Sequence, residues 1–196
     1  KIMCGIAGLI HRGKSSNVGE ELQHMLQALK HRGPDSTGYA LYADNDGQNF
    51  ILRFKVGENV GEGSTSVNED ESVYNERKKA VDKKLSELGA LVVKEEKLTP
   101  YSYRYEIKFD KDLMEFSKAI ESIQSVEILS IGKSLELIKD LGDATVVSER
   151  YGLNKVQGTH GIGHARMATE SGVDIKSAHP FWGYPFADVS VVHNGQ

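Results

Sequence analysis

Hydrophobic residues in the first part of the chain follow strand-like patterns in some segments and a helix-like spacing in another. Residues 6–10 form a short apolar run next to glycine, which predicts a buried strand. In residues 19–29, leucine and methionine recur every three or four positions, as in an amphipathic helix. The following segment, HRGPDSTG, ends this helix because a proline disfavours the helical conformation of the residue before it. Two strands are predicted next, over residues 37–43 and 50–56, with DNDGQ as the turn between them.

The hydrophobic pattern changes in the middle of the chain. Residues 57–72 are acidic and rich in glycine and serine, which is typical of a linker or a mobile loop. From there to residue 153, apolar spacing predicts a helix, two strands, a helix, a strand and a last short helix over residues 135–141. This order favours a small α+β unit inserted into the main domain.

Glycine-rich apolar sequence returns near residue 158. Residues 158–171 predict a strand that leads into a loop, and residues 187–196 predict a strand that ends in a turn. We therefore divide the chain into a core domain at residues 1–58, an acidic loop with an inserted unit at 59–157, and the continuation of the core domain at 158–196.

Composition and charge exclude several classes of protein. The 196 residues carry a formal net charge of −4, so no basic field favours nucleic acid or an anionic membrane surface as a partner. No stretch approaches the roughly 20 apolar residues that span a bilayer, and the apolar run after Cys4 is too short for a signal peptide. A single cysteine cannot form an internal disulfide, which fits a reducing compartment. These features predict a cytoplasmic protein.

The lone cysteine, Cys4, is the first candidate for chemistry. A thiol is a strong nucleophile once it is deprotonated, and the α-amine of a chain's first residue, with a pKa of about 8, can act as its base. This arrangement requires the cysteine to be the first residue, whereas Lys1–Met3 precede it in the sequence. The alternative is a small buried apolar residue at the start of a strand, which is the commoner role of an isolated cysteine.

Polar residues on apolar strands are further candidates. Asn194 and Gly195 end a predicted strand, where an amide side chain and a backbone N–H can form an oxyanion hole; a plain Asn-Gly turn is the alternative. Arg166 follows small and apolar residues, and a buried guanidinium needs an anionic partner, either a ligand carboxylate or a structural ion pair. Arg32 raises the same question, because Asp35 lies close enough in sequence to pair with it.

Two apparent motifs are set aside. SIGKS at residues 130–134 resembles the end of a phosphate-binding loop, but Glu127 stands where that pattern needs glycine. His160 and His164 lie four positions apart on a predicted strand, without further ligands at metal-site spacing, so we predict no metal site.

Taken in order, five segments resemble a known family: CGIAGLI, HRGPDSTG, GHARMATES, HPF and SVVHNGQ. Together they are similar to the class II glutamine amidotransferase domain, an N-terminal-nucleophile (Ntn) hydrolase, over about the first 55 and the last 40 residues. The chain looks most like the stand-alone amidotransferase subunit of glutamate synthase-like enzymes. The resemblance implies an α+β fold with the αββα sandwich core of Ntn hydrolases, incomplete here at its C-terminus, and a small inserted α+β unit.

The resemblance also implies roles for individual residues. Cys4 would attack the side-chain carboxamide of L-glutamine, release ammonia and form a thioester that water hydrolyses to glutamate. Asn194 and Gly195 would form the oxyanion hole. The other residues implied at the substrate site are Arg166, which would clamp the α-carboxylate of glutamine, and Thr169, Arg32 and His193.

The same resemblance implies that the ammonia passes to a synthase subunit or domain, with glutamate synthesis as the first expectation. The chain shows no flavin, nicotinamide or iron–sulfur signature, so any such cofactor would belong to that partner. Lys1–Met3 would have to be removed to free the α-amine of Cys4, and we expect the chain to be a fragment or one piece of a split protein. The alternative is a non-catalytic or proenzyme form of the same fold that binds glutamine or docks a partner.

Overall fold

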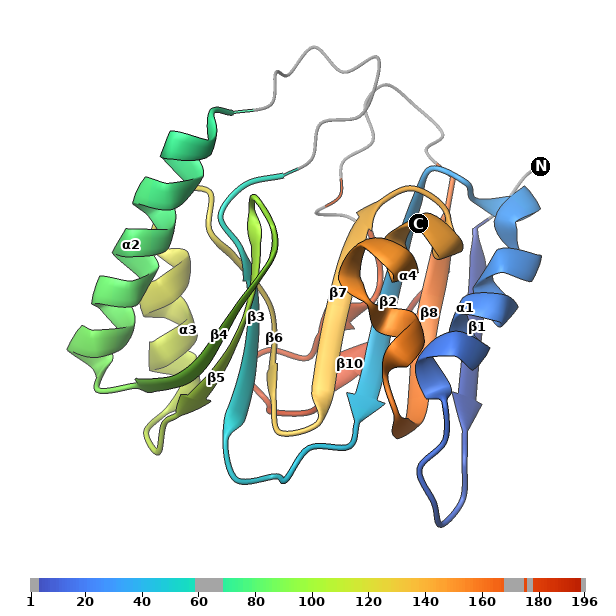
Figure 1. Ribbon diagram of the computed structural model, residues 1–196, viewed down its shortest axis with the longest axis horizontal. Coiled ribbons are helices and arrows are strands. Elements are labelled where there is room, and N and C mark those ends of the chain that lie inside the picture. Colours follow the sequence, from blue (N-terminus) through green and yellow to red (C-terminus); the bar gives the residue numbers. More distant parts are fainter. Residues whose placement is uncertain (1–3, 59–68, 168–174, 176–177, 195–196) are drawn as a thin grey trace.

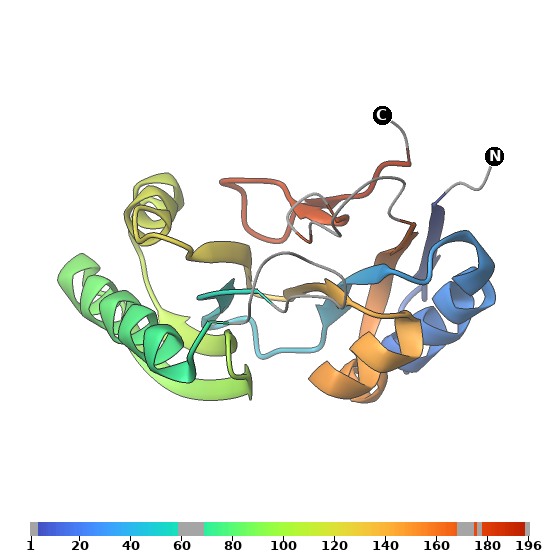
Figure 2. The ribbon, with the colours of Figure 1, turned by 90° about the horizontal axis from the view of Figure 1, so that it is seen from above.

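The computed structural model describes residues 4–58, 69–167, 175 and 178–194. Within them, the chain forms two four-stranded antiparallel sheets that lie side by side, and a short hairpin lies against the same side of both sheets (Figures 1 and 2). The α+β class predicted from the sequence is confirmed. Most of the predicted acidic loop, residues 59–68, lies outside the described residues.

The first sheet, which we call sheet A, combines strands from both parts of the predicted core. Because β8 lies between β1 and β2, residues far apart in the sequence, such as Ile6 and His164, become direct cross-strand neighbours. In spatial order its strands are β1 (Gly5–Ile10), β8 (Gly158–Arg166), β2 (Ser36–Ala43) and β7 (Leu135–Leu141).

Two helices, α1 (Val18–Ala28) and α4 (Ala144–Tyr151), cover one face of sheet A (Figure 2). Helix α1 buries Leu22 and Leu26 against the sheet, as its predicted amphipathic pattern requires. A Cβ atom at Gly163 of β8 would lie 2.5 Å from a methyl group of Leu26, so glycine permits the close approach of helix and strand. The opposite face, which none of the described helices covers, is called the open face below.

The second sheet, sheet B, is built mainly from the predicted insertion. Its helices, α2 (Glu71–Leu88) and α3 (Leu113–Glu121), pack on the outer side of the sheet (Figure 1). Helix α2 begins after Asp70, whose carboxylate accepts a hydrogen bond from the Ser72 N–H, and ends at Gly89 with a left-handed φ of 80°. In spatial order the strands are β4 (Leu91–Thr99), β5 (Ser102–Lys108), β3 (Phe50–Lys55) and β6 (Glu127–Gly132).

Two predictions about local structure are wrong. Residues 135–141, predicted as a helix, form strand β7. Their apolar spacing suits a helix, but they pair with β2 and are buried on both faces of the strand, so long-range pairing overrides the local pattern. The turn expected between the second and third strands does not close a hairpin, because β2 belongs to sheet A and β3 to sheet B.

Strands β3 and β7 bring the two sheets together at a buried ionic cluster, which we call the joint: Arg53, Arg104 and Glu136. The Arg53 Nε donates a hydrogen bond of 2.7 Å to the Glu136 carboxylate, and Arg104 donates to the same carboxylate at 2.8 Å. Arg53 and Glu136 are only 3% and 4% exposed. The contact between the sheets therefore includes buried charges as well as apolar side chains.

Sheet membership crosses the predicted domain boundaries. Strand β3 precedes residue 58 but lies in sheet B, and β7 falls between residues 59 and 157 but lies in sheet A. The division of the chain into domains stays a prediction. Within the described residues, none of the helices has the apolar length that a membrane crossing requires.

Candidate active site

Cys4 lies at the start of β1 and points to the open face of sheet A. The neighbouring Gly5 faces the helices, where a Cβ atom would meet Leu29 at 3.0 Å, and strand alternation turns Cys4 to the opposite side. The Cys4 side chain is a half-buried free thiol. A nucleophile at this position would act on the face that the helices leave uncovered.

Asn194 reaches Cys4 from the other end of the chain. Its side-chain Nδ2 donates a hydrogen bond of 2.8 Å to the Cys4 carbonyl oxygen. Two of the residues singled out from the sequence are thus brought into contact. The amide nitrogen carries two hydrogens, so one can donate to a substrate oxygen while the other is bound to the Cys4 carbonyl oxygen. Gly195, the second predicted oxyanion-hole donor, lies outside the described residues.

Arg166 ends β8 beside the same point. Gly5 pairs with Ala165 across the two strands, so Arg166 lies level with Cys4, and alternation places both residues on the open face. Arg166 is half-buried and has interaction partners of its own. A guanidinium next to the thiol is suited to bind a carboxylate of a small ligand.

Two further predicted substrate residues, Arg32 and Thr169, are not placed next to Cys4 by the described structure. Arg32 is exposed at the end of a short 3-10 helix, Lys30–Arg32. The next residue, Gly33, packs on β8, because a Cβ atom there would lie 2.4 Å from the backbone carbon of Arg166. Arg32 therefore lies at the margin of the site. Thr169 lies outside the described residues.

Three histidines that the sequence analysis did not connect cluster on the open face: His164 from β8, and His179 and His193 from the last segment. The ring centroids of His164 and His179 are 5.3 Å apart, and those of His179 and His193 are 6.3 Å apart. The Nδ1 atom of His179 accepts a hydrogen bond of 3.2 Å from the His193 backbone N–H. Because His193 precedes Asn194, this cluster extends to Cys4. His164 carried a signal in the sequence as a polar residue on an apolar strand, and His179 belongs to the HPF segment of the family resemblance, but the resemblance implied a role for neither.

Burial and nearby charge favour the neutral form of the His164 and His179 rings. His164 is 2% exposed, and neither of its ring nitrogens has a hydrogen-bond partner in the described part of the chain. Burial, together with the charges of His179 and Arg166, lowers the pKa of His164 to about 4. Burial and the charges of His193, Lys139 and Arg166 also lower the pKa of His179. The cluster therefore offers neutral nitrogens beside fixed cations.

The hairpin of β9 (Phe181–Trp182) and β10 (Ser190–Val191) carries the chain toward Asn194, and Asp188 anchors it (Figure 2). The Asp188 carboxylate accepts hydrogen bonds of 2.8–3.0 Å from three backbone N–H groups of the turn between β6 and β7, those of Lys133, Ser134 and Leu135. This turn includes the end of the SIGKS segment. Its amides, which a phosphate would need, are occupied by a carboxylate of the same chain.

The histidine pair that resembled a metal site does not converge. The His160 ring stacks on Tyr42, with centroids 3.9 Å apart, while His164 lies next to His179. Among the described residues, no group of three histidine, cysteine or acidic side chains is arranged to hold a metal ion.

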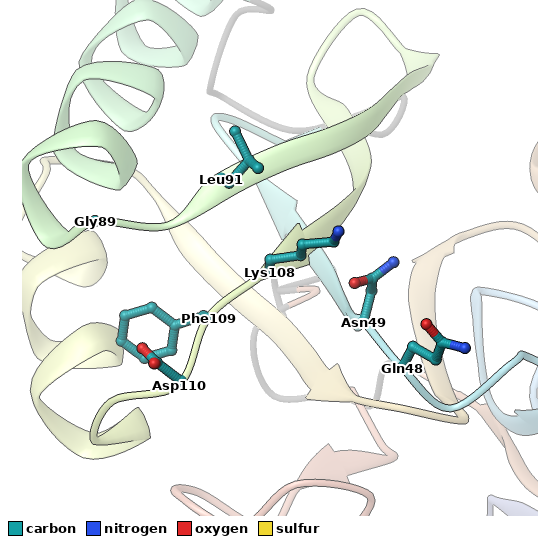
Figure 3. A pocket seen from close by; sticks show the side chains of 7 residues that line it. All are labelled: Gln48, Asn49, Gly89, Leu91, Lys108, Phe109 and Asp110. Atoms are coloured by element: carbon teal, nitrogen blue, oxygen red, sulfur yellow. The ribbon is translucent and has the colours of Figure 1, made fainter.

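A separate pocket of about 440 Å³ lies on sheet B, between the start of β4 and the end of β5 (Figure 3). Lys108 and Asp110 give it opposite charges, and Leu91 gives it an apolar wall. The site around Cys4 contributes none of its described lining residues, which are Gln48, Asn49, Gly89, Leu91, Lys108, Phe109 and Asp110.

Comparisons with known proteins find similarity to glutamine amidotransferases. Residues 3–49 match the glutamine amidotransferase domain family. The chain is 36% identical over 202 residues to a provisionally named glutamine amidotransferase of Methanothermobacter thermautotrophicus, covering 99% of this chain and 61% of that protein. It is 31% identical over 195 residues to the glutamine amidotransferase-like protein GlxB of Rhizobium meliloti, covering 98% of this chain and 58% of that protein.

A third similarity is shorter. It is to a glutamine–fructose-6-phosphate aminotransferase (isomerizing) of Pyrobaculum aerophilum, with 35% identity over 71 residues, 36% of this chain and 12% of that protein. The chain thus matches the first two relatives over nearly all of its own length, but it spans only 61% and 58% of theirs.

Proposed function

Since these comparisons support a place for the chain in the glutamine amidotransferase family, we propose that it hydrolyses L-glutamine to glutamate and ammonia by the class II mechanism. Cys4 is the nucleophile in this proposal, and its own α-amine is the base, which requires Cys4 to be the first residue of the mature protein. The ammonia is passed to a synthase partner, and a glutamate synthase-like enzyme is the partner class that we favour. Any flavin or iron–sulfur cofactor belongs to that partner.

The proposed reaction has two stages. The α-amine takes the thiol proton, and the Cys4 sulfur attacks the side-chain carbonyl carbon of glutamine to give a tetrahedral oxyanion. Collapse of this intermediate breaks the C–N bond, and the departing nitrogen takes a proton and leaves as ammonia. Water then attacks the resulting thioester, which gives glutamate and restores the thiol. Asn194 and Gly195 stabilise the oxyanion, and Arg166 with Thr169 binds the α-carboxylate.

One observation carries the proposal: the Asn194 amide lies against Cys4, with 2.8 Å between its Nδ2 and the Cys4 carbonyl oxygen. A nucleophile and an amide donor from opposite ends of the chain thus share one point on the open face. Arg166 on the adjacent strand adds a cation for a carboxylate ligand. A cysteine that only filled space at a strand start would need neither neighbour.

We also propose that sheet A is one of the two sheets of an Ntn-type αββα sandwich. Helices α1 and α4 supply an outer layer on one face. On the open face, Ile6 is 40% exposed and Ile10 is 71% exposed, which suits a surface that packs against a second sheet.

The test is glutamine hydrolysis by the full-length protein with its natural N-terminus, with glutamate and ammonia measured together. We expect Cys4→Ala to lower this activity by a factor on the order of 1,000 or more, with an unchanged melting temperature. An intact mass that starts at Cys4, and covalent labelling of Cys4 by a glutamine-analogue electrophile, would support the N-terminal nucleophile.

Three results would contradict the proposal. Full activity in a mature protein that keeps Lys1–Met3 would exclude the α-amine as base. Unchanged activity in Cys4→Ala would exclude the thiol as nucleophile. Glutamine binding without hydrolysis would instead support the alternative of a non-catalytic binding module.

A further inference from the structure

The His179 side chain contacts the backbone that leads directly into Asn194. Its Nδ1 accepts the hydrogen bond from the His193 N–H at 3.2 Å, and its ring also interacts with the backbone of Val191. The positions contacted are one and three residues before Asn194. The ring therefore fixes the course of the chain immediately before the amide that meets Cys4.

The His179 ring is itself held in place from several sides. Phe181 packs edge-on against it, with centroids 4.5 Å apart, and His164 lies beneath it on β8. Its backbone rests on β2: a Cβ atom at Gly38 would lie 2.0 Å from the His179 carbonyl oxygen. A ring fixed in this way can define the position of a flexible neighbour.

The acceptor role requires that Nδ1 carries no proton. Lys139 of β7, Arg166 of β8 and His193 all place positive or ionisable groups near the ring, and burial adds to their effect. All of these influences favour the neutral ring. The Val191 backbone acts in the opposite direction.

We propose that His179 is a positioning residue for catalysis: by accepting the His193 N–H, it holds Asn194 where its amide can stabilise the oxyanion formed on Cys4. This inference rests on the proposed glutaminase function. Since Asn194 acts on the transition state, loss of its position lowers kcat, while the affinity for glutamine, which Arg166 serves, changes little.

The test compares two substitutions at this position in the full-length protein. His179→Asn places an amide oxygen close to the position of Nδ1 and keeps an acceptor, whereas His179→Leu removes it. We expect His179→Leu to lower kcat by about tenfold to 100-fold, with KM changed by less than about threefold. His179→Asn should restore most of the loss.

A second measurement separates positioning from general damage. The aldehyde analogue of glutamine forms a tetrahedral adduct with a catalytic thiol, while glutamate binds without one. His179→Leu should weaken binding of the aldehyde about as much as it lowers kcat and should leave glutamate binding unchanged. If His179→Leu does not fold, His179→Gln, whose acceptor lies near Nε2 instead, takes its place in the comparison with His179→Asn.

The outcomes are distinct. Equal kcat values for wild type and His179→Leu in an active enzyme would overturn this inference alone, as would equal weakening of aldehyde and glutamate. Equal losses in His179→Asn and His179→Leu would also overturn it, because the retained acceptor would then have no effect. A folded wild-type protein with Cys4 at its N-terminus that hydrolyses no glutamine would overturn the proposed function and this inference with it.

Discussion

The joint between the sheets and the histidine cluster beside Cys4 both bury polar side chains, but they treat them differently. At the joint, the Glu136 carboxylate receives hydrogen bonds from both Arg53 and Arg104. In the histidine cluster, His164 is buried to the same degree, yet its ring nitrogens find no partner within the described residues. The Glu136 carboxylate is paired and serves stability, although the Arg53 Nη1 atom finds no hydrogen-bond partner in the part of the chain that the structure describes. At His164 both ring nitrogens lack such a partner, and an unsatisfied buried group costs free energy and is typical of functional sites.

The two regions also shift pKa values for different reasons. Burial acts to raise the pKa of Glu136, but the charges of Arg53 and Arg104 outweigh it and lower the value to about 2. At His164, burial itself lowers the pKa to about 4, and the nearby cations act in the same direction. Glu136 is therefore charged because two arginines pair with it, whereas His164 is neutral because no anion among the described residues pairs with it.

Removing the charge at the joint should have the largest effect on stability. We expect Glu136→Gln to lower the free energy of unfolding by roughly 3–5 kcal/mol, because it leaves the buried Arg53 guanidinium without its anion. Arg104, by contrast, keeps Glu96 as a partner. Chemical denaturation would measure this. Glu87→Gln, which breaks exposed ion pairs with Lys83 and Lys84, is the matched control and should change little. Similar small losses in both variants would show that the joint adds nothing to stability.

A smaller effect is expected when the pH is lowered. The pKa of His164 is about 4 in the folded state, against an ordinary value of 6.5. As the pH falls from 6.5 to about 4, the unfolded chain therefore binds a proton that the folded chain does not, and the folded state loses stability. Each unit is worth about 1.4 kcal/mol, so the loss is up to about 3 kcal/mol. Denaturation at a series of pH values would detect it.

Substitution sharpens this pH comparison. His164→Phe should remove the loss between pH 6.5 and 4, and Glu136→Gln should remove a separate loss between pH 4.5 and about 2. An unchanged profile in His164→Phe would mean that the ring does not become charged on unfolding in this range, contrary to our interpretation.

The smallest expected change in stability comes from a methyl group at Gly38. In Gly38→Ala, the added carbon would lie 2.0 Å from the His179 carbonyl oxygen, so the segment must move, at a cost of about 1–3 kcal/mol. Glutaminase activity should fall more than stability does. Gly8→Ala is the control. Gly8 lies on the same face, but its added carbon would be 3.2 Å from the flexible Ile162 side chain, a much less severe contact. Equal activity in the two variants would contradict the importance of this contact.

Local sequence patterns predicted what depends on neighbours along the chain. The alternation in residues 103–109 anticipated β5, and the leucine spacing of α1 anticipated its buried face. The pattern failed for β7, because Leu135, Ile138 and Leu141 fit one helical face, while pairing with β2 is a long-range contact. Sequence motifs likewise indicated Cys4 and Asn194, but the role of His179 depends on a contact across 14 residues that no spacing rule reveals.

The grip of Asp188 on the turn between β6 and β7 has a consequence for how the chain is built. That turn connects β6 of sheet B to β7 of sheet A, and the Asp188 carboxylate binds the β9–β10 hairpin to it. The position of the Asn194 amide thus depends on sheet B as well as on sheet A. Deleting the inserted residues would therefore remove a contact that helps to position the Asn194 amide, even though helices α2 and α3 lie far from the Cys4 thiol.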